Sequence, residues 1–115
     1  MLIEEIINDY LNTLEEAPAP SYTEMPKIFP CKCYLIEKTG DSRRDHINRA
    51  TVAIQSYGGS LYEAATLNEA LKDIMLNDLI QLEEVSGVKL NSDYNYTDIT
   101  TKRYRYQAVF SVTYY

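Results

Sequence analysis

The sequence has few residues of the kinds that form metal and disulfide sites. It contains one histidine, His46, and two cysteines, Cys31 and Cys33. A zinc site needs a second pair of Cys or His ligands, which the chain lacks. Along a strand the cysteines would lie about 6.6 Å apart, whereas a disulfide needs Cβ atoms about 4 Å apart. We therefore expect reduced, half-buried thiols, no metal and no other cofactor.

Phosphate-binding and catalytic motifs are also missing. Gly58 and Gly59 lie between a predicted strand and a predicted helix, but no phosphate-loop lysine and no spaced glycines of a dinucleotide site accompany them. His46 follows Asp45, yet no serine or cysteine nucleophile stands in a recognisable motif. We expect no enzymatic activity, although a small enzyme with buried acid-base groups stays an alternative, because a sequence cannot reveal such groups.

Long apolar runs are absent. No stretch approaches the roughly 20 residues of a membrane-spanning helix, so we expect no membrane partner. The N-terminal stretch is acidic and lacks the basic and apolar regions of a secretory signal, which predicts synthesis and folding in the cytoplasm. At 115 residues, with 45% hydrophobic and 24% charged residues, the composition predicts a single globular domain over residues 1–115.

Basic residues are missing from the N-terminal segment. Six of the 17 acidic residues precede Lys27, and no basic residue does. The other 11 acids balance the 11 Lys and Arg, so the formal net charge of −6 belongs to the N-terminal segment. Lys and Arg supply most of the affinity for nucleic-acid phosphates, so we expect no sequence-specific nucleic-acid binding. A small nucleic-acid-binding module that uses the later arginines stays an alternative.

The clearest structural pattern is a strand, a glycine turn and a helix in the middle of the chain. Residues 50–56 alternate and are rich in β-branched side chains, which predicts a strand. Ser60 lies three positions before Glu63, as in a capping box, where the hydroxyl accepts from an early helical amide and the carboxylate reaches back to the cap's own amide. The apolar residues that follow recur at helical spacing: Leu61, Ala64, Leu67, Leu71, Ile74 and Met75.

The flanking segments predict the remaining elements of an α+β fold. We expect two amphipathic helices packed on a mainly antiparallel sheet of about four strands, with a C-terminal β-hairpin. Residues 31–115 would hold the sheet and the central helix. The other predicted segments are an N-terminal helix in 1–16, a proline-rich connector in 17–30, a strand in 31–38, a charged loop in 40–48, a strand in 85–96 with a break near Gly87 or Ser92, a turn in 97–102 and a strand in 103–115.

Tyrosines and arginines mark a candidate interface. Six of the 11 tyrosines lie from Tyr94 onward, where cross-strand packing, subunit contact and base stacking are all possible roles. Stacking is the weakest of these, because few cations lie nearby. We hypothesise that arginines contact an acidic patch of a neighbouring copy while tyrosines supply apolar area. The candidate subunit or partner interface consists of Arg43, Arg44, Tyr94, Tyr96, Arg103 and Arg105.

Three stretches of the sequence carry a family resemblance: YLIEKTG at residues 34–40, RATVAIQSYG continued by SLYEA in residues 49–64, and KLNSDYNY leading to KRYRYQAVF in residues 89–110. They resemble the small tail-terminator proteins of long-tailed bacteriophages and prophages, also called tail-completion or tail-to-head joining proteins. The likeness covers most of the chain after the connector, and the N-terminal helix fits by position. Another head-tail junction protein, of the head-closure or connector type, stays an alternative.

The resemblance implies a structural role. Proteins of this family form a ring, usually a hexamer, that caps the finished tail tube, stops its polymerisation and presents a surface to the head. The implied partners are further copies of the chain, the tail-tube protein and the head connector protein. The implied location is the head-tail junction of the virion, after assembly in the host cytoplasm. Such a role requires no catalysis.

Overall fold

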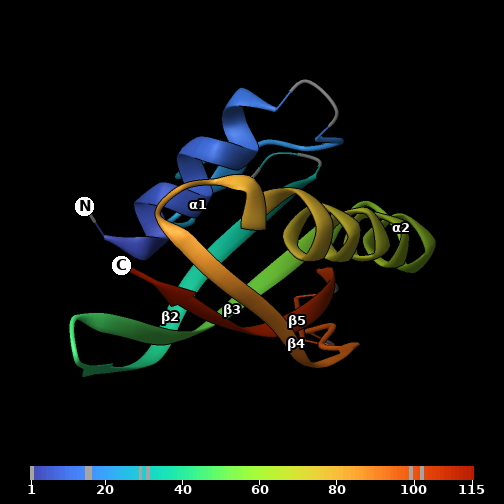
Figure 1. The fold of residues 1–115 in the computed structure, drawn as a ribbon. Helices are drawn as coiled ribbons and strands as arrows, with labels where there is room; N and C mark the ends of the chain where they lie inside the picture. The colour runs from blue at the N-terminus through green and yellow to red at the C-terminus, as the bar shows by residue number, and fades with distance from the viewer. Residues whose placement is uncertain (1, 15–16, 29, 31, 99, 102) are drawn as a thin grey trace.

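The computed structural model describes residues 2–14, 17–28, 30, 32–98, 100–101 and 103–115. Within these residues the fold is α+β, with two α-helices and a five-stranded mixed sheet in the order β1-β2-β3-β5-β4 (Figure 1). Strand β1 pairs in parallel with β2, and the other pairs are antiparallel. The elements are α1 (Ile3–Thr13), β1 (Ser21–Tyr22), β2 (Cys33–Arg44), β3 (Ile47–Gly58), α2 (Leu61–Asp73), a π-helical turn (Ile74–Asp78), a 3-10 turn (Leu79–Gln81), β4 (Val85–Asn95) and β5 (Tyr104–Tyr114).

The predicted architecture is confirmed at the level of the α+β class. About four strands were expected, and the fifth is the two-residue β1, which lies inside the predicted connector. The C-terminal strands β4 and β5 pair as an antiparallel hairpin. The predicted break in β4 is also confirmed, because its register against β5 shifts between Val85 and Gly87 and again between Leu90 and Ser92.

Both helices cover the same face of the sheet, and the core lies between them and the strands (Figure 1). One of the two alternating sets of β3 side chains and the apolar stripe of α1 point into this core, as the sequence patterns predicted. Tyr34 of β2 is fully buried, and its hydroxyl donates to the Leu67 carbonyl of α2 at 2.8 Å. The fully buried core includes Ile7, Tyr34, Ile36, Ala50, Val52, Ile54, Leu71, Ala108, Phe110 and Val112.

Helix α2 begins at the predicted cap. The Ser60 hydroxyl accepts from the Glu63 amide at 3.1 Å, which confirms the first half of the capping box. The Glu63 carboxylate accepts from the Gly59 amide at 2.8 Å, so it reaches one residue further back than we expected. Leu61 was placed on the apolar stripe but is 41% exposed, because the first turn of α2 extends beyond the sheet.

Replacing Ser60 with alanine should lower the free energy of unfolding by about 1 kcal/mol, since an early helical amide loses its acceptor. Urea denaturation followed by circular dichroism measures this loss. Thr66→Ala is a suitable control, because Thr66 is an exposed residue of the same helix whose hydroxyl bonds only to the Tyr62 carbonyl. An unchanged midpoint for Ser60→Ala would show that the cap does not stabilise α2.

The prediction of a loop at residues 40–48 is wrong. Strands β2 and β3 continue through it as an antiparallel hairpin whose turn is Asp45 and His46. Both turn residues have left-handed backbones, with φ of 52° and 67°, which is the geometry of a type I′ turn and matches the twist of the paired strands. Residues 39–47, called the arm below, are all exposed.

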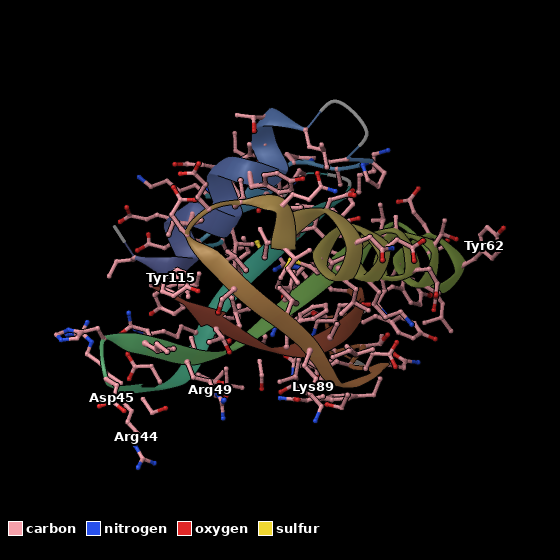
Figure 2. The ribbon with its side chains drawn as sticks, viewed as in Figure 1. Arg44, Asp45, Arg49, Tyr62, Lys89 and Tyr115 are labelled. Atoms are coloured by element: carbon pink, nitrogen blue, oxygen red, sulfur yellow. The ribbon has the colours of Figure 1, made fainter. Side chains whose placement is uncertain are left out.

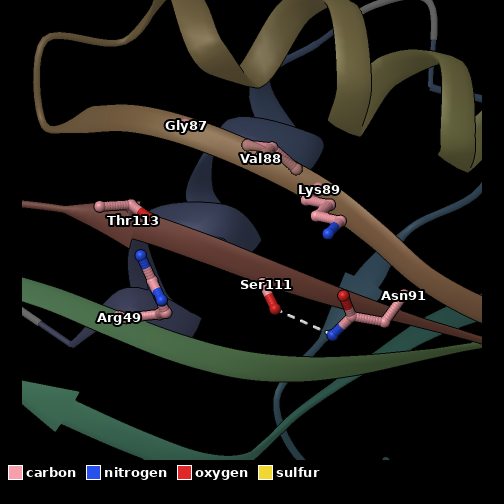
Figure 3. Close-up of a pocket in the computed structure, with 7 residues that line it drawn as sticks. All are labelled: Arg49, Gly87, Val88, Lys89, Asn91, Ser111 and Thr113. Atoms are coloured by element: carbon pink, nitrogen blue, oxygen red, sulfur yellow. Dashed lines mark hydrogen bonds between the residues drawn. The ribbon is translucent and has the colours of Figure 1, made fainter.

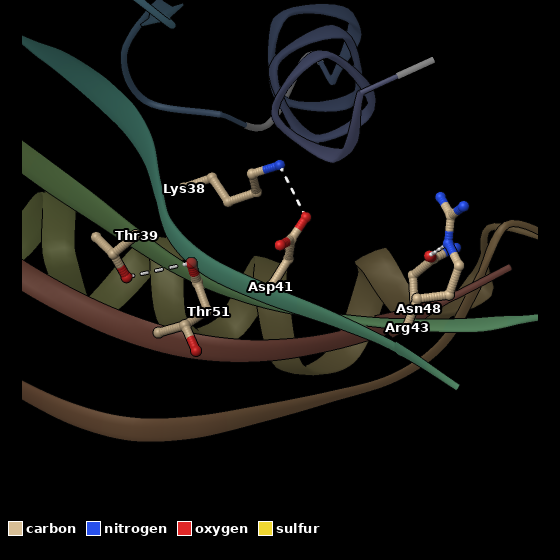
Figure 4. A network of polar contacts seen from close by, with 6 residues as sticks. All are labelled: Lys38, Thr39, Asp41, Arg43, Asn48 and Thr51. Carbon is tan, nitrogen blue, oxygen red and sulfur yellow. Dashed lines mark hydrogen bonds and ion pairs between the residues drawn. The ribbon is translucent and has the colours of Figure 1, made fainter.

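Polar side chains support the arm on the side that faces α1 (Figure 4). Lys38 donates to Asp41 at 3.2 Å, and the Nε of Arg43 donates to Asn48 across the hairpin at 2.6 Å. These contacts, together with the ladder between the strands, explain how so charged a segment forms a strand pair.

A bulge precedes the arm. Lys38 pairs with Val52 and Gly40 pairs with Thr51, so Thr39 is an extra residue in β2. Its hydroxyl donates to the Thr51 carbonyl at 3.3 Å (Figure 4). Because side chains alternate along a strand, the extra residue exchanges the two faces for every later residue of β2.

Candidate interaction surface

The second face of the sheet carries no helix in the described parts of the chain, and we call it the open face (Figure 1). Strand alternation and register decide which side chains lie on it. Arg44, Arg49 and Lys89 extend from this face, away from α1 and α2 (Figure 2). Its remaining residues include Ile47, Gln55, Tyr57, Tyr94, Arg105 and Gln107.

The two faces of the sheet differ in charge. Among the described strand residues of the open face, Glu37 is the single acid, against the four cations Arg44, Arg49, Lys89 and Arg105. On the other side, α1 carries three acids and no cation. The sheet therefore separates a basic surface from an acidic helix.

Two adjoining hollows lie in the basic part of the open face. A hollow of about 390 Å³ is lined by residues of β3, β4 and β5, including Arg49 and Lys89 (Figure 3). A second, of about 430 Å³, lies beside the arm and is lined by Arg44, Arg49 and the single acid Asp45, among others. We call the two hollows with these three cations the basic trough. The side chains of the cations make no hydrogen bond and no ion pair with another described residue.

The floor of the first hollow is polar. Asn91 donates to the Ser111 hydroxyl at 2.9 Å, and Thr113 lies beside them (Figure 3). No carboxylate lines this hollow among the described residues. Two cations, an amide and two hydroxyls can together accept a negatively charged group, and a carboxylate is the commonest such group on proteins.

At the other end of the open face, Arg105 lies between two tyrosine rings. Its guanidinium is 4.5 Å from the centre of the Tyr96 ring and 5.8 Å from that of Tyr57. It donates to the Tyr57 hydroxyl at 2.9 Å and to the Tyr96 carbonyl at 2.6 Å. Tyr94 packs edge-on against Tyr96 at 5.8 Å between ring centres. These four residues form the tyrosine-arginine cluster.

Two glutamines extend this cluster into the sheet. The Tyr57 hydroxyl donates to Gln55 at 2.9 Å, and Gln55 donates to Gln107 at 3.0 Å. Gln107 in turn donates to the Tyr94 hydroxyl. Because these hydrogen bonds link the side chains to one another, the cluster is ordered before any binding, which lowers the entropic cost of using it as a contact surface.

The structure places four of the six predicted interface residues on the open face. Arg44, Tyr94, Tyr96 and Arg105 lie on the open face. Arg43 lies on the opposite face of the arm. Arg103 is exposed just before β5, where its backbone pairs with Asp98.

Sequence reasoning missed Arg49, Lys89, Gln55, Tyr57 and Gln107. The alternation of β3 contained a signal for part of this set, because Arg49, Gln55 and Tyr57 share a face once the strand is extended to Ile47. The alternation of β5 likewise puts Gln107 on the face of Arg105, although it was not named as an interface residue. Lys89 could not be placed, since its face depends on two bulges in β4.

Of the two cysteines, only Cys33 lies among the described residues, and it is fully buried with a free thiol. Burial raises its pKa to about 11, against a smaller opposing effect of the Arg103 charge. Among the described residues, no cluster of His, Cys, Asp and Glu could hold a metal ion. Likewise, no helix in this part of the chain is both long and apolar enough to span a bilayer.

In a Cys31→Ser background, native Cys33 should react with a thiol reagent far more slowly at neutral pH than the unfolded chain does. Two causes act together, because the side chain is inaccessible and its thiolate is suppressed. Since the folded pKa is raised, its contribution to stability should fall as the pH rises from 9.0 to about 11. Fast stoichiometric labelling of the native protein, or bound zinc by elemental analysis, would contradict this.

No protein-family model matches this chain, and no curated protein is similar enough in sequence to count as a match.

Proposed function

We propose that the chain is a structural protein of a phage head-tail junction, a tail terminator that caps the tail tube as a homo-oligomeric ring. The observation that carries the proposal is the separation of charge across the sheet, with the basic trough on one side and acidic α1 on the other. Two complementary surfaces on one molecule favour a head-to-tail contact between copies, and such contacts close into rings when the rotation permits.

The resemblance of three stretches of the sequence to tail-terminator proteins supports the same role. The tyrosine-arginine cluster supplies a second, pre-ordered contact surface, because Tyr and Arg are enriched at the energetic centres of interfaces. We propose the tail-tube protein and the head connector as its partners, and the virion's head-tail junction as its location. The proposed role is assembly and involves no catalysed reaction.

Deleting the gene from its phage or prophage tests this proposal. Tails assembled without the chain should be abnormally long and should fail to join heads, as seen by electron microscopy. Purified chain added to short tube assemblies should stop their growth and form a ring at the tube end. Tails of normal length that join heads without this chain would overturn the proposal.

Another head-tail junction protein is the first alternative, and tail length separates the two. Loss of a head-closure or connector protein should leave tails of normal length that are not joined to heads. A nucleic-acid-binding module is the second alternative, favoured by the cations of the basic trough beside exposed tyrosines. That alternative predicts binding to DNA or RNA that weakens steeply with added salt.

A further inference from the structure

We propose that the basic trough of one copy binds the exposed acidic stripe of α1 of a second copy. This inference rests on the proposed function in that it names the contact by which copies would join. It commits to one partner, a second copy of this chain, and to one pair of surfaces. Nothing in the sequence patterns alone identified Arg49 or Lys89 as part of such a contact.

The trough has the form of a receptor for carboxylates. Its two hollows share Arg49. The first holds Arg49 with Lys89 and no described carboxylate, whereas the second holds Arg44 with Arg49 and one acid, Asp45. The cations have no partner among the described residues, so a contact with carboxylates would not break existing pairs. Ile47, 45% exposed at the edge of the second hollow, adds apolar area.

Helix α1 has the matching charges. Glu5 and Asp9 are both exposed and four residues apart, so they neighbour each other on one side of the helix. Like charges at this spacing repel, and neither carboxylate pairs with a described residue. Cations from another molecule would replace this repulsion with attraction.

Within one copy these surfaces cannot meet. Helix α1 packs on the covered face of the sheet, whereas Arg44, Arg49 and Lys89 extend from the open face (Figure 2). An open row of copies joined by this contact therefore has an unoccupied trough at one end and an unoccupied α1 at the other. Successive copies add in one direction until a closed ring leaves neither surface free.

Two charge-reversed variants test the contact. The trough variant is Arg49→Glu with Lys89→Glu, and the helix variant is Glu5→Lys with Asp9→Lys. Self-association is measured by light scattering coupled to size exclusion, at low ionic strength where surface charges are least screened. We expect each variant alone to associate at least about tenfold more weakly than the wild-type chain. An equimolar mixture should regain wild-type association, because each reversed surface then meets its complement.

Lys27→Glu with Lys32→Glu is the matched control for the trough variant, since both lysines are exposed, lie outside the trough and change the net charge by the same amount as that variant. This control should associate like the wild-type chain. Circular dichroism and denaturation midpoints establish that all variants fold. Recovery of self-association in the mixture would indicate that two different surfaces meet in the contact. If one self-complementary surface made the contact, the two variants would not rescue each other.

The outcomes separate this inference from the proposed function. If the trough variant still forms rings, or the mixture fails to recover, the contact is wrong while the capping role stands. If the mixture recovers but gene deletion leaves tail length and head joining normal, the contact stands and the capping role fails. If the wild-type chain stays monomeric and instead binds DNA or RNA through Arg49 and Lys89, the contact is overturned.

Discussion

Phe110→Ala should lower the free energy of unfolding by about 3–5 kcal/mol. Phe110 lies at the middle of β5 with none of its surface exposed, paired with Val52 of β3 on one side and Leu90 of β4 on the other. Alanine would leave a cavity beneath the helices that rigid neighbours on both sides cannot fill. Chemical denaturation measures the loss.

The control for this substitution is the adjacent residue, Val109→Ala. Val109 lies on the open face and is only partly buried, so its truncation should cost about 1 kcal/mol or less. The two neighbours thus report on opposite faces of one strand. Similar losses for both variants would contradict the assignment of a helix-covered face and an open face.

Gly58→Ala should destabilise the fold by about 3 kcal/mol because β3 and α2 approach too closely there for a side chain. A Cβ at Gly58 would lie 2.6 Å from the backbone nitrogen of Ala64 and 3.1 Å from its Cα. Backbone atoms of a capped helix cannot give way as a flexible side chain does. The strand and the helix would have to separate, which disturbs the core beneath α2.

Gly87→Ala is the comparison, since no atom lies within 4 Å of a Cβ placed there and its backbone has no positive φ. It should change the midpoint little, or raise it slightly through the lower entropy of the unfolded chain. Equal behaviour of the two variants would show that the close approach at Gly58 does not limit packing.

The elements that sequence predicted well are those with a strong local pattern. Residues 50–56 alternate over a buried strand, Ser60 and Glu63 mark a helix start, and Gly87 lies where β4 is bulged. Each of these signals depends on neighbours within a few positions. The α+β class followed from their order along the chain.

The arm and the trough were not predictable in this way. The charged residues of 40–48 indicated a loop, whereas the segment forms two strands because each half pairs with the other across the turn at Asp45 and His46. Arg49 and Lys89 lie on strands separated by β5, so their proximity depends on two registers. Local sequence patterns carry no information about which strands pair or in which register.

The bulge at Thr39 changes which residues of β2 lie on the open face. Upstream of it, odd-numbered residues of β2 share the side of Leu35 and Glu37, and downstream of it even-numbered residues, Ser42 and Arg44, take that side. Deleting Thr39 would remove only the unpaired residue, so Ser42 and Arg44 would still lie opposite Arg49 and Ile47 on the open face. The pairing of the arm with β3 thus sets which of two adjacent arginines lies on the open face, and the bulge accommodates the extra residue without altering the core.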